Sequence, residues 1–494
     1  MSLINVTNLT FSYENSYENI FENVSFQIDT DWKLGLIGRN GRGKTTFFNL
    51  LLGKYEYRGS ISADISFEYF PYEVTDKNQY TIDVMKEICP KCMDWEMIKE
   101  TSLLNVDTDV LYRPFCTLSK GEQTKVLLAA LFLVSESFLL IDEPTNHLDM
   151  EGRRTLGNYL KKKKGFILIS HDRKLLDSCV NHIISINRTN IEIQKGNFSL
   201  WWDNKSLQDN FEIMQNEKLK KEISRLTVAA RRSAGWSDKV EKSKYNERSS
   251  GSKIDRGYVG HKSAKAMKRS KNIEARQQEA ILKKTRLLQN VETYDDLQIR
   301  CLDYHKHCLV EIKDMALFYG NREICNGINF SIHRGDRIAL YGGNGCGKSS
   351  IVKLICGKNI HYAGKLSVGS GLKISYISQD TSNLKGKLSE FIIENNIDET
   401  LFKSILRKLD FHREQFEKNI DDFSSGQKKK VLIAKSLCEK AHLYIWDEPL
   451  NFLDVFSRIQ IEEMILRYQP TLLFVEHDET FREKIATMSI DLKY

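Results

Sequence analysis

Two adjacent carboxylates directly follow an apolar run in the first half of the chain. Residues 138–141 are Phe-Leu-Leu-Ile, and Asp142 and Glu143 come next. Such a run is typical of a buried parallel strand, and open α/β sheets bind ligands at the carboxyl ends of their strands. At that edge one carboxylate could hold Mg²⁺ and the next could orient a water nucleophile for phosphoryl transfer. The alternative is an ordinary buried strand followed by an acidic turn.

The same arrangement occurs a second time, which argues against that alternative. Asp447 and Glu448 follow the apolar residues 443–446. Three other elements also recur in the same order: a glycine-rich loop, a Ser-x-Gly segment and a His-Asp pair. They occupy residues 38–45 and 342–349, 118–123 and 423–428, and 170–172 and 476–478. Four elements in one order, found twice, indicate an internal duplication.

Each glycine-rich loop has the sequence context of a phosphate-binding loop. The first follows a predicted strand, residues 32–37, and precedes a predicted helix, residues 45–52. Glycines let backbone amides turn toward phosphates, the helix N-terminus adds positive potential, and Lys44 supplies a point charge. The hydroxyl of Thr45 is a ligand for Mg²⁺. A loop of this kind serves many classes of nucleoside triphosphatase.

Composition is that of a cytoplasmic globular protein of two or three domains. The 494 residues are 41% apolar and 28% charged. The first residues lack the pattern of a secretory signal, and the longest apolar run, residues 126–134, is too short to span a membrane. Ten scattered cysteines without the spacing of a disulfide framework favour a reducing compartment. Cys89 with Cys92, and a Cys/His group at residues 301–308, match no recognised metal-ligand spacing, so we expect no metal there.

Positive charge is concentrated between the two repeats. The net charge is +7, and residues 211–290 alone hold 21 Lys and Arg against 9 Asp and Glu. Apolar residues recur there at helical spacing, and Gly and Ser at 249–252 and 257–260 interrupt the pattern. We expect two antiparallel helices of about 35 residues that reach roughly 50 Å. A solvated charged linker is the alternative. The candidate RNA contacts are Lys218, Lys220, Lys221, Arg225, Trp236, Lys244, Tyr245, Arg256 and Tyr258.

With the loop and the Ser-x-Gly-Glu/Gln segment in each half, both halves resemble ABC nucleotide-binding domains. The form Asp-Glu-Pro-Thr-Asn-His-Leu-Asp at residues 142–149 resembles the ABC-F family in particular. The resemblance implies an α/β fold with two tandem ABC-type P-loop domains, residues 1–202 and 307–494. A long helical-hairpin linker, residues 203–306, joins them.

The resemblance also implies an ATPase that uses ATP and Mg²⁺. Glu143 and Glu448 would be catalytic, together with His171 and His477. The Mg²⁺ ligands would be Thr45, Asp142, Ser349, Gln379 and Asp447. Other ATP contacts would be Tyr13, Gly38, Asn40, Gly41, Gly43, Lys44, Thr46, Ser119, Gly121, Glu122, Tyr319, Gly342, Asn344, Gly345, Gly347, Lys348, Ser350, Ser424, Gly426 and Gln427. Tyr13 and Tyr319 would stack on nucleobases, with a core aromatic as the alternative.

In this family each ATP lies between the loop of one half and the serine segment of the other half. Lys44 would therefore work with Ser424, and Lys348 with Ser119, within a monomer. The halves are not identical, because Tyr72 stands where the second half has Gln379. Leu450 and Phe452 likewise replace a Thr and a His of the first half. The two sites are therefore expected to be chemically unequal.

Within ABC-F, the sequence is similar to the antibiotic-resistance members. The interval between residues 72 and 119 has no room for an extra helical arm, and the chain ends soon after His477. Residues 231–239 and 255–265 most resemble Lsa-type proteins. That implies binding to the exit (E) site and 23S rRNA of the 70S ribosome, beside P-site tRNA, without a membrane or a permease. It also implies protection against lincosamides, pleuromutilins and streptogramin A.

Three other functions remain open at this point. A housekeeping ABC-F translation factor would keep the ribosome but have no drug role. The ATPase subunit of an ABC transporter would need a separate permease, against which the long basic segment argues. A DNA-bound ABC ATPase normally has its coiled coil inside one nucleotide domain, not between two.

Overall fold

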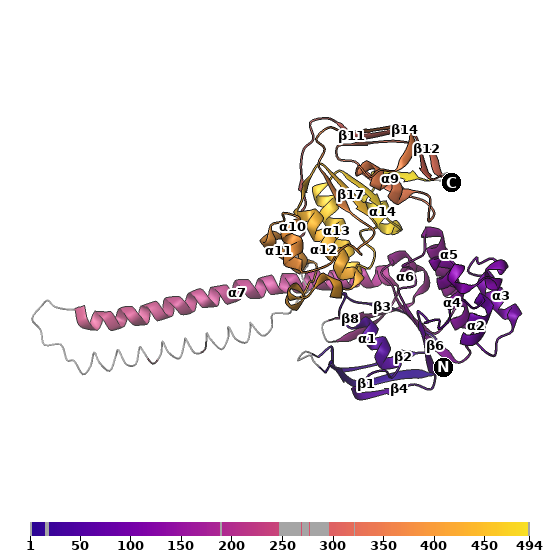
Figure 1. Cartoon of the computed structure of the whole chain (residues 1–494). Helices are drawn as coiled ribbons and strands as arrows, with labels where there is room; N and C mark the ends of the chain where they lie inside the picture. The colour runs from indigo at the N-terminus through magenta and orange to yellow at the C-terminus, as the bar shows by residue number, and fades with distance from the viewer. Residues whose placement is uncertain are drawn as a thin grey trace, which may run out of the picture. The chain divides into compact units, whose positions relative to one another are not determined.

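The structure is a computed structural model that describes residues 2–14, 19–187, 190–246, 268, 276, 296–320 and 322–492. The chain divides into two compact units, one combining residues 1–201 with 294–494 and one spanning residues 202–293. The first unit contains both copies of the repeat, and the second contains the basic linker. The elements of both units can be followed in Figure 1.

The first copy combines a mainly parallel sheet with a small antiparallel sheet. The larger sheet has the order β5-β6-β7-β3-β8-β9, with β9 antiparallel to β8, and the smaller has the order β2-β1-β4. The strands are β1 (Leu3–Phe11), β2 (Phe21–Asp29), β3 (Lys33–Ile37), β4 (Arg58–Ser62), β5 (Ser66–Phe70), β6 (Ser137–Asp142), β7 (Phe166–Ile169), β8 (His182–Ile186) and β9 (Ile191–Lys195). The helices are α1 (Lys44–Leu51), α2 (Thr81–Ile88), α3 (Asp94–Ser102), η1 (Thr108–Tyr112), η2 (Phe115–Thr117), α4 (Lys120–Leu133), α5 (Met150–Lys162) and α6 (Arg173–Cys179).

The second copy repeats this architecture. Its parallel sheet has the order β15-β17-β18-β13-β19, and its antiparallel sheet has the order β12-β11-β14. The strands are β10 (Arg300–Cys301), β11 (Cys308–Tyr319), β12 (Arg322–His333), β13 (Arg337–Tyr341), β14 (His361–Val368), β15 (Ile374–Ile377), β16 (Lys440–Ala441), β17 (Leu443–Asp447), β18 (Leu472–Val475) and β19 (Met488–Asp491). The helices are α9 (Lys348–Ile355), α10 (Leu388–Glu394), α11 (Glu399–Lys408), η3 (Arg413–Glu417), η4 (Ile420–Asp422), α12 (Ser425–Cys438), α13 (Val455–Tyr468) and α14 (Glu479–Ile485). The predicted α/β class with two tandem copies is confirmed.

The apolar runs before the paired carboxylates are interior strands of the parallel sheets. Leu140 and Ile141 of β6, and Ile445 and Trp446 of β17, have no exposed surface. Each strand lies between two hydrogen-bonded neighbours and is covered on both faces, which explains a continuous apolar run instead of alternation. The carboxylates that follow are therefore held at the edge of a rigid core.

The linker begins with one long helix, α7 (Phe198–Asn246), of 49 residues. This length corresponds to roughly 74 Å, longer than the sequence predicted. The helix starts before residue 203 because Phe198 and Trp201 are buried in the first unit. Residues 236–246 of the expected tip, about residues 236–260, continue α7 as helix, whereas the rest of the tip and the returning helix lie outside the described residues, apart from residues 268 and 276. On the far side, Leu297 and Ile299 are buried in the core of the second copy, so the first unit resumes before the predicted boundary at residue 307.

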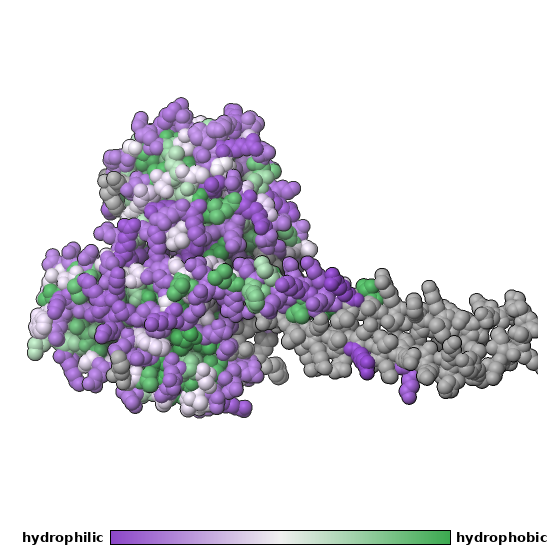
Figure 2. All heavy atoms as spheres, turned by 180° about the vertical axis from the view of Figure 1, so that it is seen from behind, coloured by the Kyte–Doolittle hydropathy of each residue, from purple (hydrophilic) through white to green (hydrophobic). Residues whose placement is uncertain are grey.

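The cysteines depart from the sequence expectation at one point. Cys89 and Cys92 form a disulfide, because the turn after α2 places their Cα atoms 5.6 Å apart, whereas the scattered spacing favoured free thiols. In the part of the chain that the structure describes, no group of three or more His, Cys, Asp or Glu side chains could hold a metal ion. No helix among the described residues is long and apolar enough to cross a membrane. Figure 2 shows a mainly hydrophilic surface with small hydrophobic patches.

Candidate functional site

The glycine-rich loops connect β3 to α1 and β13 to α9. Gly43 and Gly347 have φ angles of 89° and 92°, a left-handed backbone that glycine adopts without strain. A side chain on Gly43 would also place its Cβ 2.5 Å from Cγ2 of Ile20. Within the described residues no side chain caps either helix, so the first backbone N–H groups of each helix are available to an anion.

The loop lysines lie inside these loops. Lys44 is 9% exposed and Lys348 is 7% exposed. Nζ of Lys44 donates to the carbonyl oxygen of Gly38 at 2.7 Å, and Nζ of Lys348 donates to that of Gly343 at 2.7 Å. Each loop therefore holds its ammonium group beside the amides that would bind phosphates.

The hydroxyl after each lysine contacts the first carboxylate of the facing strand. Oγ1 of Thr45 donates to Oδ2 of Asp142 at 3.1 Å, and Oγ of Ser349 donates to Oδ1 of Asp447 at 3.1 Å. These contacts bring together, at both sites, a hydroxyl and a carboxylate that the resemblance assigned to Mg²⁺. Such hard oxygen ligands suit Mg²⁺.

One buried atom also fits a cation at the second site. Oδ2 of Asp447 is buried and has no hydrogen-bond partner among the described residues. Burial raises the pKa of Asp447 to about 6, against the opposing effect of the hydrogen bond from Ser349. A buried carboxylate with one oxygen unsatisfied is stabilised by a bound cation. The residues present therefore fit Mg²⁺.

The second carboxylate of each pair faces a histidine. Nε2 of His171 lies 3.2 Å from Oε1 of Glu143, and Nε2 of His477 lies 3.5 Å from Oε1 of Glu448. Both glutamates have positive φ angles, 48° and 47°, which turn the chain sharply after the strand. Left-handed backbone at residues other than glycine is uncommon and is enriched at functional sites.

The environments of the two glutamates differ. Burial raises the pKa of Glu143 to about 8, and the charge of Asp142 acts in the same direction. Burial alone would also raise the pKa of Glu448, but hydrogen bonds from His477 and Gln379 hold it below its ordinary value. The predicted chemical inequality of the two sites therefore extends to their carboxylates.

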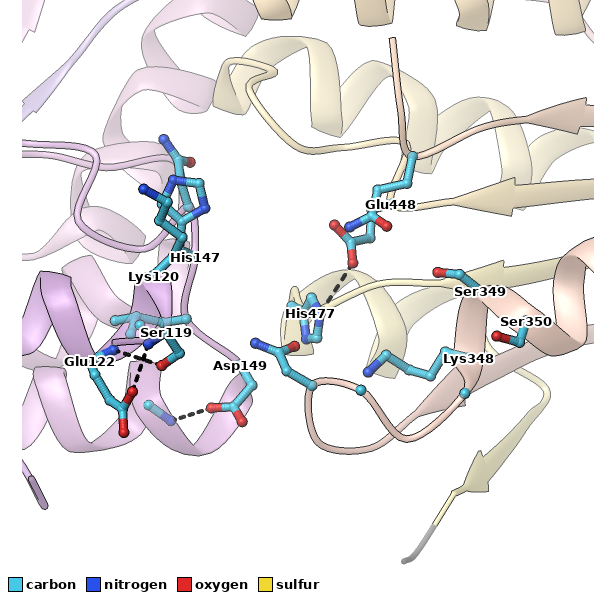
Figure 3. Close-up of a pocket in the computed structure, with 18 of the residues that line it drawn as sticks. Ser119, Lys120, Glu122, His147, Asp149, Lys348, Ser349, Ser350, Glu448 and His477 are labelled. Atoms are coloured by element: carbon cyan, nitrogen blue, oxygen red, sulfur yellow. Dashed lines mark hydrogen bonds and ion pairs between the residues drawn. The ribbon is translucent and has the colours of Figure 1, made fainter. Parts of the chain in front are cut away.

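The loop of the second half and the serine segment of the first half line one pocket of about 620 Å³. Figure 3 shows Ser119, Glu122 and His147 facing Lys348 and Glu448 across it. Other predicted residues that line it are Gly121, Tyr319, Asn344, Gly345, Gly347, Ser349, Ser350, Gln379 and His477. Gly342 lies next to it and accepts a hydrogen bond from Lys348. The pocket brings together the parts that the sequence assigned to one shared ATP site.

At the other site the two halves touch directly. Nδ2 of Asn40 in the first loop donates to the carbonyl oxygen of Phe452 at 2.9 Å, and a Cβ on Gly426 would lie 3.1 Å from that nitrogen. Burial lowers the pKa of Lys44, and the carboxylate of Asp454, from the second half, is the strongest opposing charge. The loop of the first half therefore faces the serine segment of the second half.

The serine segments and the aromatic residues have clear local roles. Ser119 and Ser424 cap α4 and α12, and form capping boxes with Glu122 and Gln427, respectively. The hydroxyl of Tyr13 lies 2.9 Å from Oγ1 of Thr46, and that of Tyr319 lies 3.2 Å from Oγ of Ser350. Tyr13 and Tyr319 are 42% and 54% exposed, so they are not core residues.

Several residues at these sites were not anticipated. Tyr69 donates to Oδ2 of Asp142 at 3.3 Å, although in the sequence it reads as an aromatic of a strand. Asn146 and Asp149 line the pocket beside His147. Arg173 forms a buried ion pair with Glu462 of the other half, and no local pattern marks that pair. A comparison of corresponding positions in the two repeats would have found Tyr69, because Tyr376 occupies the same place.

The predicted RNA contacts fall partly within the described residues. Lys218, Lys220, Lys221 and Arg225 are exposed on α7. Trp236, Lys244 and Tyr245 are residues of α7, for which the structure describes the backbone and not the side chains. Arg256 and Tyr258 lie outside the described residues altogether.

Lys44→Ala and Ser424→Ala are expected to disable the same nucleotide site, because the first loop contacts the second half's serine segment. When two residues act as one unit, removing the second costs little more activity than removing the first. The ATPase rate of the double variant should therefore be within about 2-fold of that of the more impaired single variant. Steady-state ATPase assays of the four proteins test this. Lys44→Ala with Ser119→Ala is the matched control, and its losses should multiply because Ser119 lines the other pocket. Multiplied losses for the first pair would show that the site is not shared.

Comparisons with known proteins agree with this geometry. A family model described as ABC transporter matches residues 21–146 and 325–451. The ATP-binding protein Uup of Buchnera aphidicola subsp. Acyrthosiphon pisum is 27% identical over 521 residues, 98% of this chain and 80% of Uup. The ribosome protection protein VmlR of Bacillus subtilis is 27% identical over 503 residues, 99% of this chain and 86% of VmlR. The ABC transporter F family member 2 of Arabidopsis thaliana is 24% identical over 547 residues, 99% of this chain and 76% of that protein.

A solved structure shares the fold. The chain is similar to one in the crystal structure of the complex of archaeal ribosomal stalk protein aP1 and archaeal ribosome recycling factor aABCE1. The TM-score is 0.62 at 18% identity, over 98% of this chain and 87% of that chain. That likeness concerns the fold. The match of the family model to both halves, with these relatives, identifies the chain as an ATPase of the ABC transporter family, in its ABC-F group.

Proposed function

We propose that the chain is an ATP-driven ribosome-protection protein that dislodges antibiotics from the peptidyl-transferase centre. The observation that carries the proposal is α7, a helix of 49 residues with exposed cations that comes between the two nucleotide-binding halves in the sequence. Similarity to VmlR along 99% of the chain supports a ribosomal role. The drugs would be lincosamides, pleuromutilins and streptogramin A. The protein would bind the vacant E site of the 70S ribosome as a monomer.

In this proposal the two ATP sites drive a cycle of closure and reopening. Lys44 and Lys348 hold the phosphates, and Glu143 and Glu448 orient and deprotonate the attacking water. His171 and His477 hold these carboxylates in place. Thr45 with Asp142, and Ser349 with Asp447 and Gln379, would hold Mg²⁺, which would supply positive charge to the phosphates. With two ATP bound the halves close and the protein stays on the ribosome, and hydrolysis releases it.

The linker would provide the contacts to 23S rRNA and to P-site tRNA. Its cations neutralise phosphates without reading sequence, and its aromatic residues stack on unpaired bases. Lys218, Lys220, Lys221 and Arg225 would contact phosphates along α7. Trp236, Lys244, Tyr245, Arg256 and Tyr258 would act nearer the tip.

Neutralising the four cations is expected to reduce the salt dependence of ribosome binding. Each lost phosphate contact should lower the slope of log affinity against log salt by roughly 0.7–0.9. The variant Lys218→Gln/Lys220→Gln/Lys221→Gln/Arg225→Gln would be compared with the wild type by sedimentation at several KCl concentrations. A matched control changes four exposed lysines of the ATPase halves, Lys77, Lys161, Lys385 and Lys418, to Gln. An unchanged slope would show that these cations contact no phosphates and only form a solvated helix face.

Sedimentation with 70S ribosomes is the direct test of the ribosomal role. The protein should sediment with ribosomes in the presence of a slowly hydrolysed ATP analogue and should be released when ATP is hydrolysed. Absence of co-sedimentation under both conditions would reject the proposal.

A housekeeping translation factor is the second candidate. It is kept open by the similarity to the ATP-binding protein Uup, whose name carries no drug role and which is as similar to this chain as VmlR, at 27% identity. A growth defect on deletion without any drug would favour this candidate, whereas a defect confined to drug-treated cells would favour ribosome protection.

A further inference from the structure

Lys429 is a buried cation on α12 that has no part in the sites described above. Its side chain is 1% exposed. Nζ donates to the backbone oxygen of Ser378 at 2.9 Å and to that of Asp447 at 3.5 Å. Ser378 directly precedes Gln379 after β15, and Asp447 ends β17. Lys429 therefore ties α12 to the two strand ends that carry Gln379, Asp447 and Glu448.

The charges around Lys429 strengthen this attachment. Burial lowers the pKa of Lys429, and the carboxylates of Glu476, Asp447, Glu448 and Asp380 oppose that change. A buried ammonium group is costly unless it is hydrogen-bonded and balanced by opposite charge. The hydrogen bonds that offset this cost form only while the backbone oxygens of Ser378 and Asp447 stay in place. Lys429 therefore restrains the positions of these two strand ends.

The N-terminus of α12, one turn before Lys429, contacts the first nucleotide site. Ser424 caps the helix, and Gly426 lies in its first turn. A Cβ on Gly426 would lie 3.1 Å from Nδ2 of Asn40, and this nitrogen donates to Phe452 beside it. The helix therefore has the first loop at its N-terminus and the strand ends of the second site one turn further along.

The first copy has no such connection at the same position. Thr124 occupies the place of Lys429 on α4, five residues after the capping serine in both copies. Its hydroxyl donates to the backbone oxygen of Lys120, one turn back in the same helix, at 3.0 Å. The helix that contacts the second site is therefore not tied by this side chain to the strand ends of the first.

We propose that Lys429 is a positioning residue through which ATP at the first loop controls hydrolysis at the second loop. When nucleotide draws the N-terminus of α12 toward the first loop, Lys429 moves the loops that carry Gln379 and Glu448 with it. Thr124 makes no equivalent contact, so the first copy has no matching side chain through which ATP at the second loop would control hydrolysis at the first. The link concerns the ATP cycle alone and does not depend on the ribosome.

Lys429→Thr, which installs the residue of the first copy, tests this link. In a Glu143→Gln background, where Glu448 performs the hydrolysis, kcat should fall by about 10- to 100-fold with little change in KM, as expected for a misplaced catalytic group. In a Glu448→Gln background the same change should alter kcat by less than about 2-fold. Lys435→Met, at a partly exposed lysine of the same helix that pairs with Glu439, is the matched control and should have no effect in either background. Equal losses in both backgrounds, or no loss in either, would overturn the proposal.

A double-mutant cycle measures the coupling itself. Ser424→Ala should lower kcat in the Glu143→Gln background when Lys429 is present and should add little to Lys429→Thr, because both changes break one path. Independent losses would contradict the link. If a single Glu→Gln background does not hydrolyse ATP, cooperativity of ATP binding in the Glu143→Gln/Glu448→Gln protein decides the question. There Lys429→Thr should reduce the Hill coefficient to about 1, Lys435→Met should not, and an unchanged coefficient would overturn the proposal.

Discussion

ATP hydrolysis is expected to fall by about 10²- to 10⁴-fold when Glu143 and Glu448 are both replaced by Gln. The change removes the two bases but keeps the lysines, hydroxyls and first carboxylates that would bind ATP and Mg²⁺. Phosphate release measures the loss of hydrolysis, and equilibrium binding of a fluorescent ATP analogue measures what is retained. Binding should remain within a few-fold of the wild type.

The same variant is expected to stay on ribosomes after ATP is added, because closure needs binding and release needs hydrolysis. Sedimentation at successive times after ATP addition follows its release. Glu87→Gln/Glu417→Gln, which alters two exposed glutamates that do not line the pockets, is the matched control and should leave at the wild-type rate. Release of the Glu143→Gln/Glu448→Gln protein at that rate would show that leaving the ribosome does not depend on ATP hydrolysis.

Loss of drug protection is expected when residues 243–257 are replaced by a short Gly/Ser connection. The sequence places the tip of the linker there, and the tip is the part that would act at the drug site. Displacement could occur by direct contact or by a shift of rRNA bases, and both need the tip. The nucleotide sites and the basic residues of α7 before residue 243 are unchanged.

ATPase assays and sedimentation of the tip variant are its internal controls. Both should match the wild type, while growth and translation in the presence of a lincosamide should match a strain without the protein. Full protection by the shortened protein would contradict this role of the tip and would favour the housekeeping translation factor.

Local motifs allowed much of the nucleotide sites to be predicted. The glycines require a backbone that other residues avoid, and the apolar run requires a buried strand. These requirements act within a few residues, so the sequence is sufficient to place Lys44 and Asp142 in the correct elements. The resemblance to ABC nucleotide-binding domains then paired each loop with the opposite serine segment.

The contacts made by tertiary packing could not be predicted in the same way. Lys429 lies in a run of three lysines, a pattern that normally indicates a solvated surface, yet it is buried between strand ends from distant parts of the chain. Phe198 and Trp201, in the first turn of α7, are buried in the first unit, and no helical period in the sequence reveals this packing. The unequal contacts at the two sites likewise depend on pairs such as Asn40 with Phe452, which are 412 residues apart.

Translation in vitro on purified 70S ribosomes, inhibited by a lincosamide, tests ribosome protection most directly. The wild-type protein with ATP is expected to restore protein synthesis at drug concentrations that silence the reaction without it. The Glu143→Gln/Glu448→Gln protein should fail to sustain that synthesis because it remains bound. Continued inhibition in the presence of wild-type protein and ATP, on ribosomes to which the protein sediments, would contradict a role in ribosome protection.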